Sequence, residues 1–324
     1  MTSTTGVVIA SAGDVLLKVG ADGEERKLLV SSEVLRSCSF YFKALTGDKF
    51  REVQVARSAQ SPQIIVLQED DAQAMEDLCL LLHGQEPTGF RNAMTKDASA
   101  DAVVASVNRI LSLAVAIDKY DCVGRLRLQC SGLLFEWLEA CGQKPEPERW
   151  LAQLVTASYL LDNKHVFRIT AERITKETLK LPNDKDWPTA VPRKMMPERV
   201  TDAIAAKGDR SAVIFATRLR SSLYESCPLE CSDCRSQVDC AYEWQSMHTD
   251  EPWQLSIKGS MEQMQEIADD MCSSHEGDDR LEMQEALEDL GEIRSDIDRA
   301  TSGLCLKCVR GGDSLQGKCE KDDH

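Results

Sequence analysis

The stretch GDVLLKVGADGEERKLLVSSEVLRSCSFYFKALTGDKF, residues 13–50, decides the fold of the N-terminal part of this chain. Apolar residues dominate positions 15–19 and return at positions 28–30. Between these runs, the pair Asp22-Gly23 tolerates the positive φ angles that a tight turn needs. Two short apolar runs around such a turn are typical of a β-hairpin, so the sequence predicts two antiparallel strands here.

A pair of short helices is predicted directly after the hairpin. Either Ser31 or Ser32 can cap the first helix, because a hydroxyl oxygen at that position accepts a hydrogen bond from an N–H group of the first turn. The second helix carries the aromatic residues Tyr41 and Phe42. The sequence therefore predicts strand, strand, helix and helix in immediate succession.

A third strand and three longer helices are predicted after this opening. The strand covers 63–67, and the helices cover 74–83, 103–120 and 123–138, each with apolar residues at helical spacing. The interval 84–102 contains Gly, Pro, Asn and Ser, which favours a surface insertion. In the first of these helices, the side chains expected on the buried side are Met75, Leu78, Cys79, Leu81 and Leu82.

These elements and several of their residues resemble a BTB/POZ domain. Asp14 stands where that family has an Asp before its first strand, and Ser31 stands where the family usually has a His. The junction Val30-Ser31-Ser32 is similar to the fungal branch of the family. Two further family signatures, Ser-x-Tyr/Val-Phe and Phe-x-Glu, are matched by Ser39, Tyr41 and Phe42 and by Phe50, Arg51 and Glu52.

The resemblance implies an α+β class of fold with three regions. The first, over 10–141, is a BTB/POZ domain in which a short mixed sheet is flanked by helices. Pro145 and Pro147 separate it from an all-helical extension over 148–224, which loosely resembles the extensions of BTB adaptors. The third region, 225–324, is an acidic, cysteine-rich tail in which two apolar stripes predict a helical hairpin.

Charge is concentrated in the tail and argues against some partners. The formal net charge is −16, and residues 225–324 hold 25 acidic and 9 basic side chains, whereas residues 1–224 hold 29 of each. Nucleic acid is not an expected partner, because a phosphate-binding surface needs clustered Lys and Arg. The sequence shows neither a run of about 18 apolar residues nor a secretory leader, so we expect no membrane and an intracellular location, cytoplasmic or nuclear.

The thirteen cysteines fall into two groups. Five lie on apolar helical faces, where Cys behaves as a small hydrophobic residue: Cys38, Cys79, Cys122, Cys130 and Cys141. The other eight lie in the tail, where Cys231 and Cys234 form one Cys-x-x-Cys pair and Cys305 and Cys308 form another. An antiparallel helical hairpin would bring the two pairs to one end, where they could hold a structural zinc ion. The alternatives are unliganded cysteines and disulfides formed on oxidation.

Motifs of nucleotide-binding loops, serine nucleophile elbows and zinc proteases are absent from the sequence, so we expect no enzyme and no small-molecule substrate. We expect a protein-interaction module, a BTB adaptor or scaffold. The resemblance implies pairing with itself or with a cullin scaffold, as the substrate adaptor of a cullin-type ubiquitin ligase. The alternatives are a transcriptional or scaffold regulator that acts through the acidic tail, and a metal-dependent enzyme in that tail.

The resemblance also implies where the partners of this module bind. In the family, cullins contact the face made by the third helix and the loop that follows it, here about 74–90. The residues implied for the interaction surface as a whole are Asp14, Ser31, Tyr41, Phe42, Phe50 and Glu52.

Overall fold

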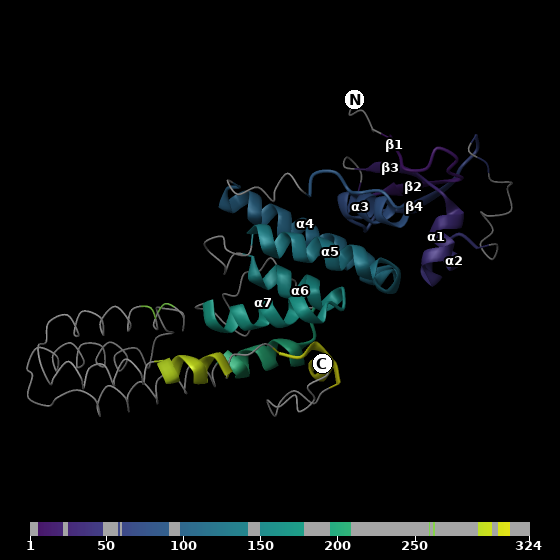
Figure 1. The fold of residues 1–324 in the computed structure, drawn as a ribbon. Coiled ribbons are helices and arrows are strands. Elements are labelled where there is room, and N and C mark those ends of the chain that lie inside the picture. Colours follow the sequence, from purple (N-terminus) through teal and green to yellow (C-terminus); the bar gives the residue numbers. More distant parts are fainter. Residues whose placement is uncertain are drawn as a thin grey trace, which may run out of the picture. The chain divides into compact units, whose positions relative to one another are not determined.

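A computed structural model of the chain describes residues 6–21, 25–47, 58, 60–90, 98–141, 150–177, 195–208, 259, 262, 291–299 and 304–311. The chain divides into two compact units, and the boundary between them falls within two helices. The first unit comprises Met1–Glu146 and Gln153–Val166, and the second comprises Pro147–Ala152 and Phe167–His324. The fold is mixed α+β, with one small sheet in the first unit and helices in both (Figure 1).

The sheet of the first unit has four strands in the order β1-β3-β2-β4. Strands β2 (Val15–Val19) and β3 (Arg26–Val30) form the predicted antiparallel hairpin. Strand β4 (Gln63–Leu67) runs parallel to β2, and β1 (Gly6–Val8) runs parallel to β3. One face is apolar and covered, and its buried side chains are Val15, Leu17, Val19, Leu28, Val30, Ile65 and Leu67.

Two short helices follow the hairpin, α1 (Ser32–Cys38) and α2 (Phe40–Leu45). Ser31 is the N-cap of α1, and its hydroxyl accepts a hydrogen bond from the Val34 N–H. Asp14, at the start of β2, accepts bonds from both the backbone N–H and the hydroxyl of Ser32, each at 2.7 Å. These contacts fix the direction in which the chain leaves the sheet, because they tie the first turn of α1 to the opposite strand of the hairpin.

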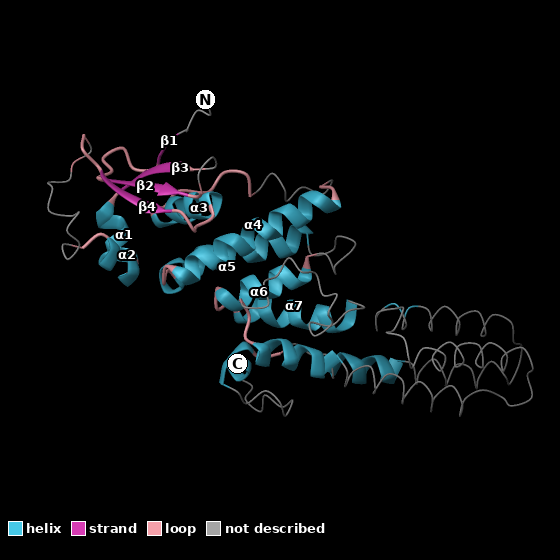
Figure 2. Ribbon diagram, turned by 180° about the vertical axis from the view of Figure 1, so that it is seen from behind, coloured by secondary structure: helices cyan, strands magenta, loops and turns pink. Residues whose placement is uncertain are grey.

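Three longer helices build the rest of the first core: α3 (Ala72–Leu82), α4 (Ala100–Lys119) and α5 (Val123–Cys141). Helix α3 covers the apolar face of the sheet, where Glu76 forms an ion pair with Arg26 of β3. Figure 2 shows α4 and α5 side by side beyond α3. The largest fully buried side chains of this core are Trp137, Tyr120, Phe42, Leu17, Leu28, Leu35, Met75, Leu78 and Ile110.

The described part of the second unit is helical. Helix α6 (Leu151–Leu160) and helix α7 (Lys164–Glu177) span the boundary between the units, and residues 198–208 and 291–299 are also helical. Within this unit Lys176 of α7 bonds to Glu172 at 2.9 Å and to Asp298 at 2.8 Å. The short helix α12 (Leu306–Gly311) ends the described chain. Most of the predicted helical hairpin lies outside the described residues.

The sequence located the elements of the first unit well, but three local expectations differ from the structure. Leu81, expected on the buried side of α3, is half-exposed. Segment 84–90, expected to belong to a surface insertion, is exposed at five of its seven residues, but it buries Pro87 and leaves Phe90 only 4% exposed. Cys38 is half-exposed at the end of α1, whereas the other four cysteines expected in the core are buried.

Helix α4 is the single described helix that is long and apolar enough to cross a membrane. Length and composition alone do not distinguish such a helix from the core helix of a globular domain. Val107, Ile110 and Ile117 of α4 are fully buried within the first unit. In this fold α4 therefore serves as a core helix.

We expect Asp14→Ala to lower the free energy of unfolding by about 1–3 kcal/mol, because the Ser32 N–H would lose its charged acceptor. Asp14→Asn should cost less, since its amide oxygen can still accept from that N–H group. Urea denaturation of the full chain with its two variants measures both costs. Equal stability of Asp14→Ala and the unmodified chain would contradict the assigned role.

Candidate functional site

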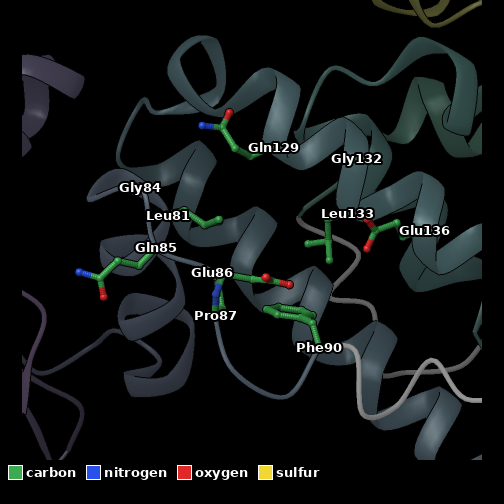
Figure 3. Close-up of a pocket in the computed structure, with 10 residues that line it drawn as sticks. All are labelled: Leu81, Gly84, Gln85, Glu86, Pro87, Phe90, Gln129, Gly132, Leu133 and Glu136. Atoms are coloured by element: carbon green, nitrogen blue, oxygen red, sulfur yellow. The ribbon is translucent and has the colours of Figure 1, made fainter.

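A pocket opens in the first unit where α3 ends and the following segment passes α5 (Figure 3). Its volume is about 330 Å³. That places it near the lower limit of typical ligand pockets, roughly 300–1,000 Å³. Apolar side chains from three elements share the lining with amides and carboxylates; the lining residues are Leu81, Gly84, Gln85, Glu86, Pro87, Phe90, Gln129, Gly132, Leu133 and Glu136.

The first wall of the pocket is the C-terminal end of α3. The chain leaves the helix through Gly84, which has a φ of +72° that a residue without a Cβ atom adopts without strain. The Gly84 N–H donates to the Leu81 carbonyl at 3.1 Å, and the Gln85 N–H donates to the Leu80 carbonyl at 2.9 Å. This pair of bonds is the Schellman motif, which ends a helix by satisfying its last carbonyls. The Gln85 side chain then donates to the Ile9 carbonyl at 2.8 Å and anchors the turn beside the sheet.

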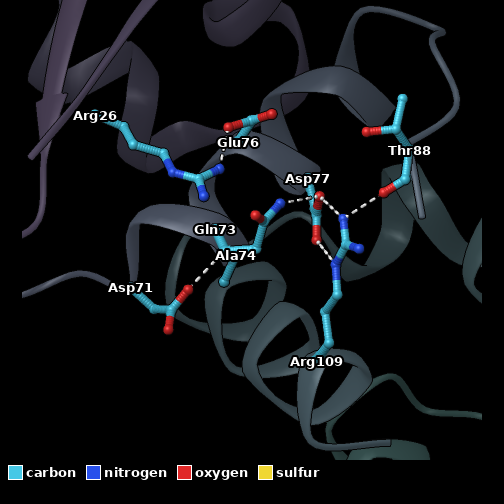
Figure 4. Close-up of polar contacts among 8 residues, drawn as sticks. All are labelled: Arg26, Asp71, Gln73, Ala74, Glu76, Asp77, Thr88 and Arg109. Carbon is cyan, nitrogen blue, oxygen red and sulfur yellow. Dashed lines mark hydrogen bonds and ion pairs between the residues drawn. The ribbon is translucent and has the colours of Figure 1, made fainter. Parts of the chain in front are cut away.

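The second wall, residues 86–90, rests on a buried ion pair between α3 and α4. Arg109 donates two parallel hydrogen bonds to Asp77, from Nε at 2.8 Å and from Nη2 at 2.7 Å (Figure 4). The Gln73 amide donates a third bond to the same carboxylate at 2.9 Å. The Asp77 side chain is 0% exposed, so its charge depends on these donors.

Arg109 also holds the segment that forms the pocket. Its Nη2 donates to the Thr88 carbonyl at 2.8 Å, and its guanidinium lies 4.3 Å from the centre of the Phe90 ring. A Cβ atom on Gly89 would lie 2.9 Å from Arg109 Nη1, and Gly89 has a φ of +90°. A residue with a Cβ atom would be strained at this φ angle and would force the Arg109 guanidinium to shift, so glycine suits this position.

His83 joins the end of α3 to the start of α1. Its Nδ1 lies 2.7 Å from the Cys79 carbonyl, and its Nε2 accepts a hydrogen bond from the Ser31 N–H at 3.1 Å. The imidazole is therefore neutral, with its proton on Nδ1, because a protonated Nε2 could not accept this bond. Burial lowers the pKa of His83 below its ordinary value, and the bond to the Cys79 carbonyl offsets part of that effect.

The third wall is α5, and its glycine keeps the pocket open. Gly132 lies within this helix, and a Cβ atom placed there would meet no atom within 4 Å. Alanine would favour the helix by roughly 0.5–1 kcal/mol over glycine. Figure 3 shows the carboxylates of Glu86 and Glu136 at the pocket beside the apolar groups of Leu133 and Phe90. Such a lining suits an apolar side chain that is accompanied by a basic group or another hydrogen-bond donor.

Four of the six residues that the BTB/POZ resemblance implied for an interaction surface are described by the structure, and they lie in or beside α1 and α2 rather than in the lining of this pocket. Asp14 and Ser31 act in the hydrogen bonds that start α1. Tyr41 is 44% exposed and packs edge-on against Tyr120, with ring centres 4.9 Å apart. Phe42 is fully buried and stacks on Tyr120 at 4.7 Å, so it supports this surface from beneath. Phe50 and Glu52 lie outside the described residues.

The predicted zinc ligands are only half described. Cys231 and Cys234 lie outside the described residues, while Cys305 and Cys308 are half-exposed at the start of α12 and within it. Among the residues that the structure describes, no group of three or more Cys, His, Asp or Glu could hold a metal ion. The zinc site stays a prediction, as do the alternatives of unliganded thiols and of disulfides.

Sequence reasoning did not single out the ion pair or the pocket. One signal was present, because Asp77 and Arg109 each interrupt the apolar pattern of a helix that is otherwise typical of a core. Gly132 is a second signal, since an isolated glycine inside a predicted helix often has a packing or functional reason. Neither signal identifies its partner, because the elements that meet here are far apart in the sequence.

No family model matches the chain, and similarity to a curated protein or to a solved structure was not found.

We expect Arg109→Met to destabilise the chain by roughly 3–5 kcal/mol, because it leaves the fully buried Asp77 carboxylate without its charged partner. Asp77→Leu should cost less, because the Arg109 side chain is 23% exposed and keeps part of its solvation. The double variant should cost less than the sum of the two, with a coupling of about 0.5–3 kcal/mol. Chemical denaturation of the four proteins measures this coupling. Lys119→Met is the control, because the pair of Lys119 with Asp70 is more exposed and should contribute at most about 1 kcal/mol.

His83 should make stability depend on pH below neutrality. Its pKa in the folded chain lies below the ordinary value of 6.5, so the unfolded chain binds the proton more readily. Neutral His83 contributes its full stabilisation above the ordinary pKa of 6.5. This contribution is lost as the pH falls from that ordinary pKa through the lower folded-state pKa. Denaturation midpoints between about pH 7.5 and pH 5 should fall less steeply for His83→Gln than for the unmodified chain.

Proposed function

We propose that this protein is an interaction module, an adaptor or scaffold that acts by binding rather than by catalysis, and that its first unit is a BTB/POZ-like domain. The order of elements supports the family assignment: a hairpin, two short helices, a strand parallel to the first strand of the hairpin, and then longer helices. Two of the residues matched to the family signatures, Asp14 before β2 and Ser39 between α1 and α2, lie at junctions between these elements, and Tyr41 lies in the first turn of α2.

The observation that carries the proposal is a pocket that is held rigidly and left open. Arg109 fixes segment 86–90 through the Thr88 carbonyl and the Phe90 ring, while Gly132 adds no side chain to the opposite wall. A surface that is fixed before binding loses less conformational entropy when a partner docks. Such a pocket is well suited to one anchoring side chain of a partner protein.

The family resemblance suggests which partner to test first. Cullin scaffolds bind the face made by the third helix and the loop after it, here about 74–90, and the pocket lies at the end of that face. We therefore propose that the partner is a cullin, and that an apolar side chain of the cullin enters the pocket. On this proposal the chain is the adaptor of a cullin-type ubiquitin ligase.

A pair of glycine variants tests the proposal without weakening the fold. Gly132→Leu would fill the pocket, whereas Gly124→Leu would place the same side chain on α5 outside the pocket lining, again with no atom within 4 Å of the new Cβ. Leucine forms helices better than glycine by up to about 1 kcal/mol, so neither variant should lower stability. We expect cullin N-terminal domains, immobilised one at a time, to bind the unmodified chain and Gly124→Leu equally, and Gly132→Leu at least tenfold more weakly.

Two other outcomes would contradict the proposal at different points. If Gly132→Leu binds as well as Gly124→Leu, the pocket is not part of the interface. If the unmodified chain binds none of the cullins, the ligase adaptor is the wrong kind of interaction module.

A further inference from the structure

The face of the sheet turned away from α3 carries an apolar row that runs across all four strands. The pairing register places Val8 beside Leu29, Leu29 beside Leu16, and Leu16 beside Ile64. Residues paired in this way point to the same face of a sheet. Arg26 of β3 reaches Glu76 of α3, so the neighbouring residues Lys27 and Leu29 face the other way.

Side chains on this face are exposed or half-exposed. Val8 and Ile64, at the two ends of the row, are 64% and 50% exposed. Val66, two residues after Ile64 on β4, is 54% exposed. Leu16 and Leu29 in the middle are half-exposed. With strands about 4.8 Å apart, four neighbouring side chains span about 14 Å. Apolar side chains at i, i+4 and i+7 of a helix span about 10 Å, a similar length.

A pair of lysines lies beside the apolar row. Lys18 of β2 and Lys27 of β3 are directly opposite each other. On this face they form the next pair along the hairpin after Leu16 and Leu29. Like charges that face each other across two strands are unfavourable. Within the part of the chain that the structure describes, neither lysine has an acidic partner. The pair therefore raises the local positive potential next to an exposed apolar surface and favours a ligand that brings carboxylates.

We infer that this face, which we call the lysine face and define by Val8, Leu16, Lys18, Lys27, Leu29 and Ile64, binds an amphipathic helix of another protein whose apolar stripe is bordered by Asp or Glu. A second copy of the chain fits less well, because it would bring two further lysines to the contact. A nucleic acid also fits less well, because four of the six residues are apolar and phosphates need several cations. The inference is independent of the pocket, which is lined by residues of α3, α5 and segment 84–90.

The probe for this surface is a fluorescein-labelled helical peptide with leucines at i, i+4 and i+7 and glutamates at the flanking positions. A matched peptide carries lysines in place of the glutamates. We expect the full chain to bind the glutamate peptide more tightly than the lysine peptide in fluorescence anisotropy at physiological salt, where charges more than about 8 Å apart are largely screened and the acidic tail contributes little, and higher salt should weaken this binding. Ile64→Asn should also weaken it, because the apolar row contributes to the contact.

Charge-reversal variants locate the binding. Lys18→Glu combined with Lys27→Glu keeps a like-charged pair in the sheet, so the fold should tolerate the exchange, while affinity for the glutamate peptide should fall at least tenfold. The control, Lys43→Glu combined with Lys164→Glu, makes the same change in net charge at two exposed lysines elsewhere. Lys18→Glu alone should raise the melting temperature, because it creates an opposite-charge pair, and yet should weaken peptide binding.

Three results would overturn the inference. The first is failure of the glutamate peptide to bind the unmodified chain. The second is an equal loss of binding in the control variant, which would show attraction to net charge alone. The third is a dimer in sedimentation that Ile64→Asn dissociates, which would show that a second copy covers the face. The cullin experiment does not involve these residues, so either proposal can fail without the other.

Discussion

The bidentate ion pair between Arg109 and Asp77 is the interaction on which the candidate site depends. Burying the Asp77 carboxylate fully and the Arg109 guanidinium in part costs free energy that their attraction offsets only when the remaining donors and acceptors are also satisfied. Here the Gln73 amide and the Thr88 carbonyl supply the further bonds, and the Phe90 ring covers the guanidinium. The pair therefore fixes a geometry more than it adds stability. It joins α3, α4 and segment 86–90, and the pocket inherits its shape from that junction.

A second set of polar contacts connects the pocket to the sheet. Asp14 holds the first turn of α1, the neighbouring Ser31 N–H bonds to His83, and Gln85 reaches the Ile9 carbonyl. Each of these contacts joins the ends of two elements. Backbone groups at the end of an element lack partners within that element, so they are free to bond to another one. Because these bonds are partly buried, they resist exchange with water. The end of α3 is therefore defined from two sides, by Arg109 on one side and by the strand ends on the other.

The sequence was sufficient for most elements of the first unit, because periodicity and caps are local properties. It predicted β4 and the cap of α1, and it identified most of the core side of α3. It misassigned Leu81 and did not foresee that Pro87 and Phe90 are buried within the otherwise exposed segment 84–90, because the burial of these residues depends on α5 and on Arg109, which are distant in the sequence. The opposition of Lys18 and Lys27 also requires the strand register, which the composition of the hairpin does not give. The predicted zinc ligands could not be judged in the same way, since Cys231 and Cys234 lie outside the described residues.

Two places in the first unit depart from what local stability favours. Gly132 weakens a helix at a position where alanine would fit, and Lys18 faces Lys27 across two strands although an acidic residue would pair better. Selection for folding alone would favour the more stable residue at each position, because neither change meets a steric obstacle that the contacts reveal. Departures of this kind concentrate where a surface is used. The glycine leaves a volume unfilled, which an apolar side chain of a partner would occupy. The two lysines leave positive charge unpaired, which carboxylates of a partner would neutralise.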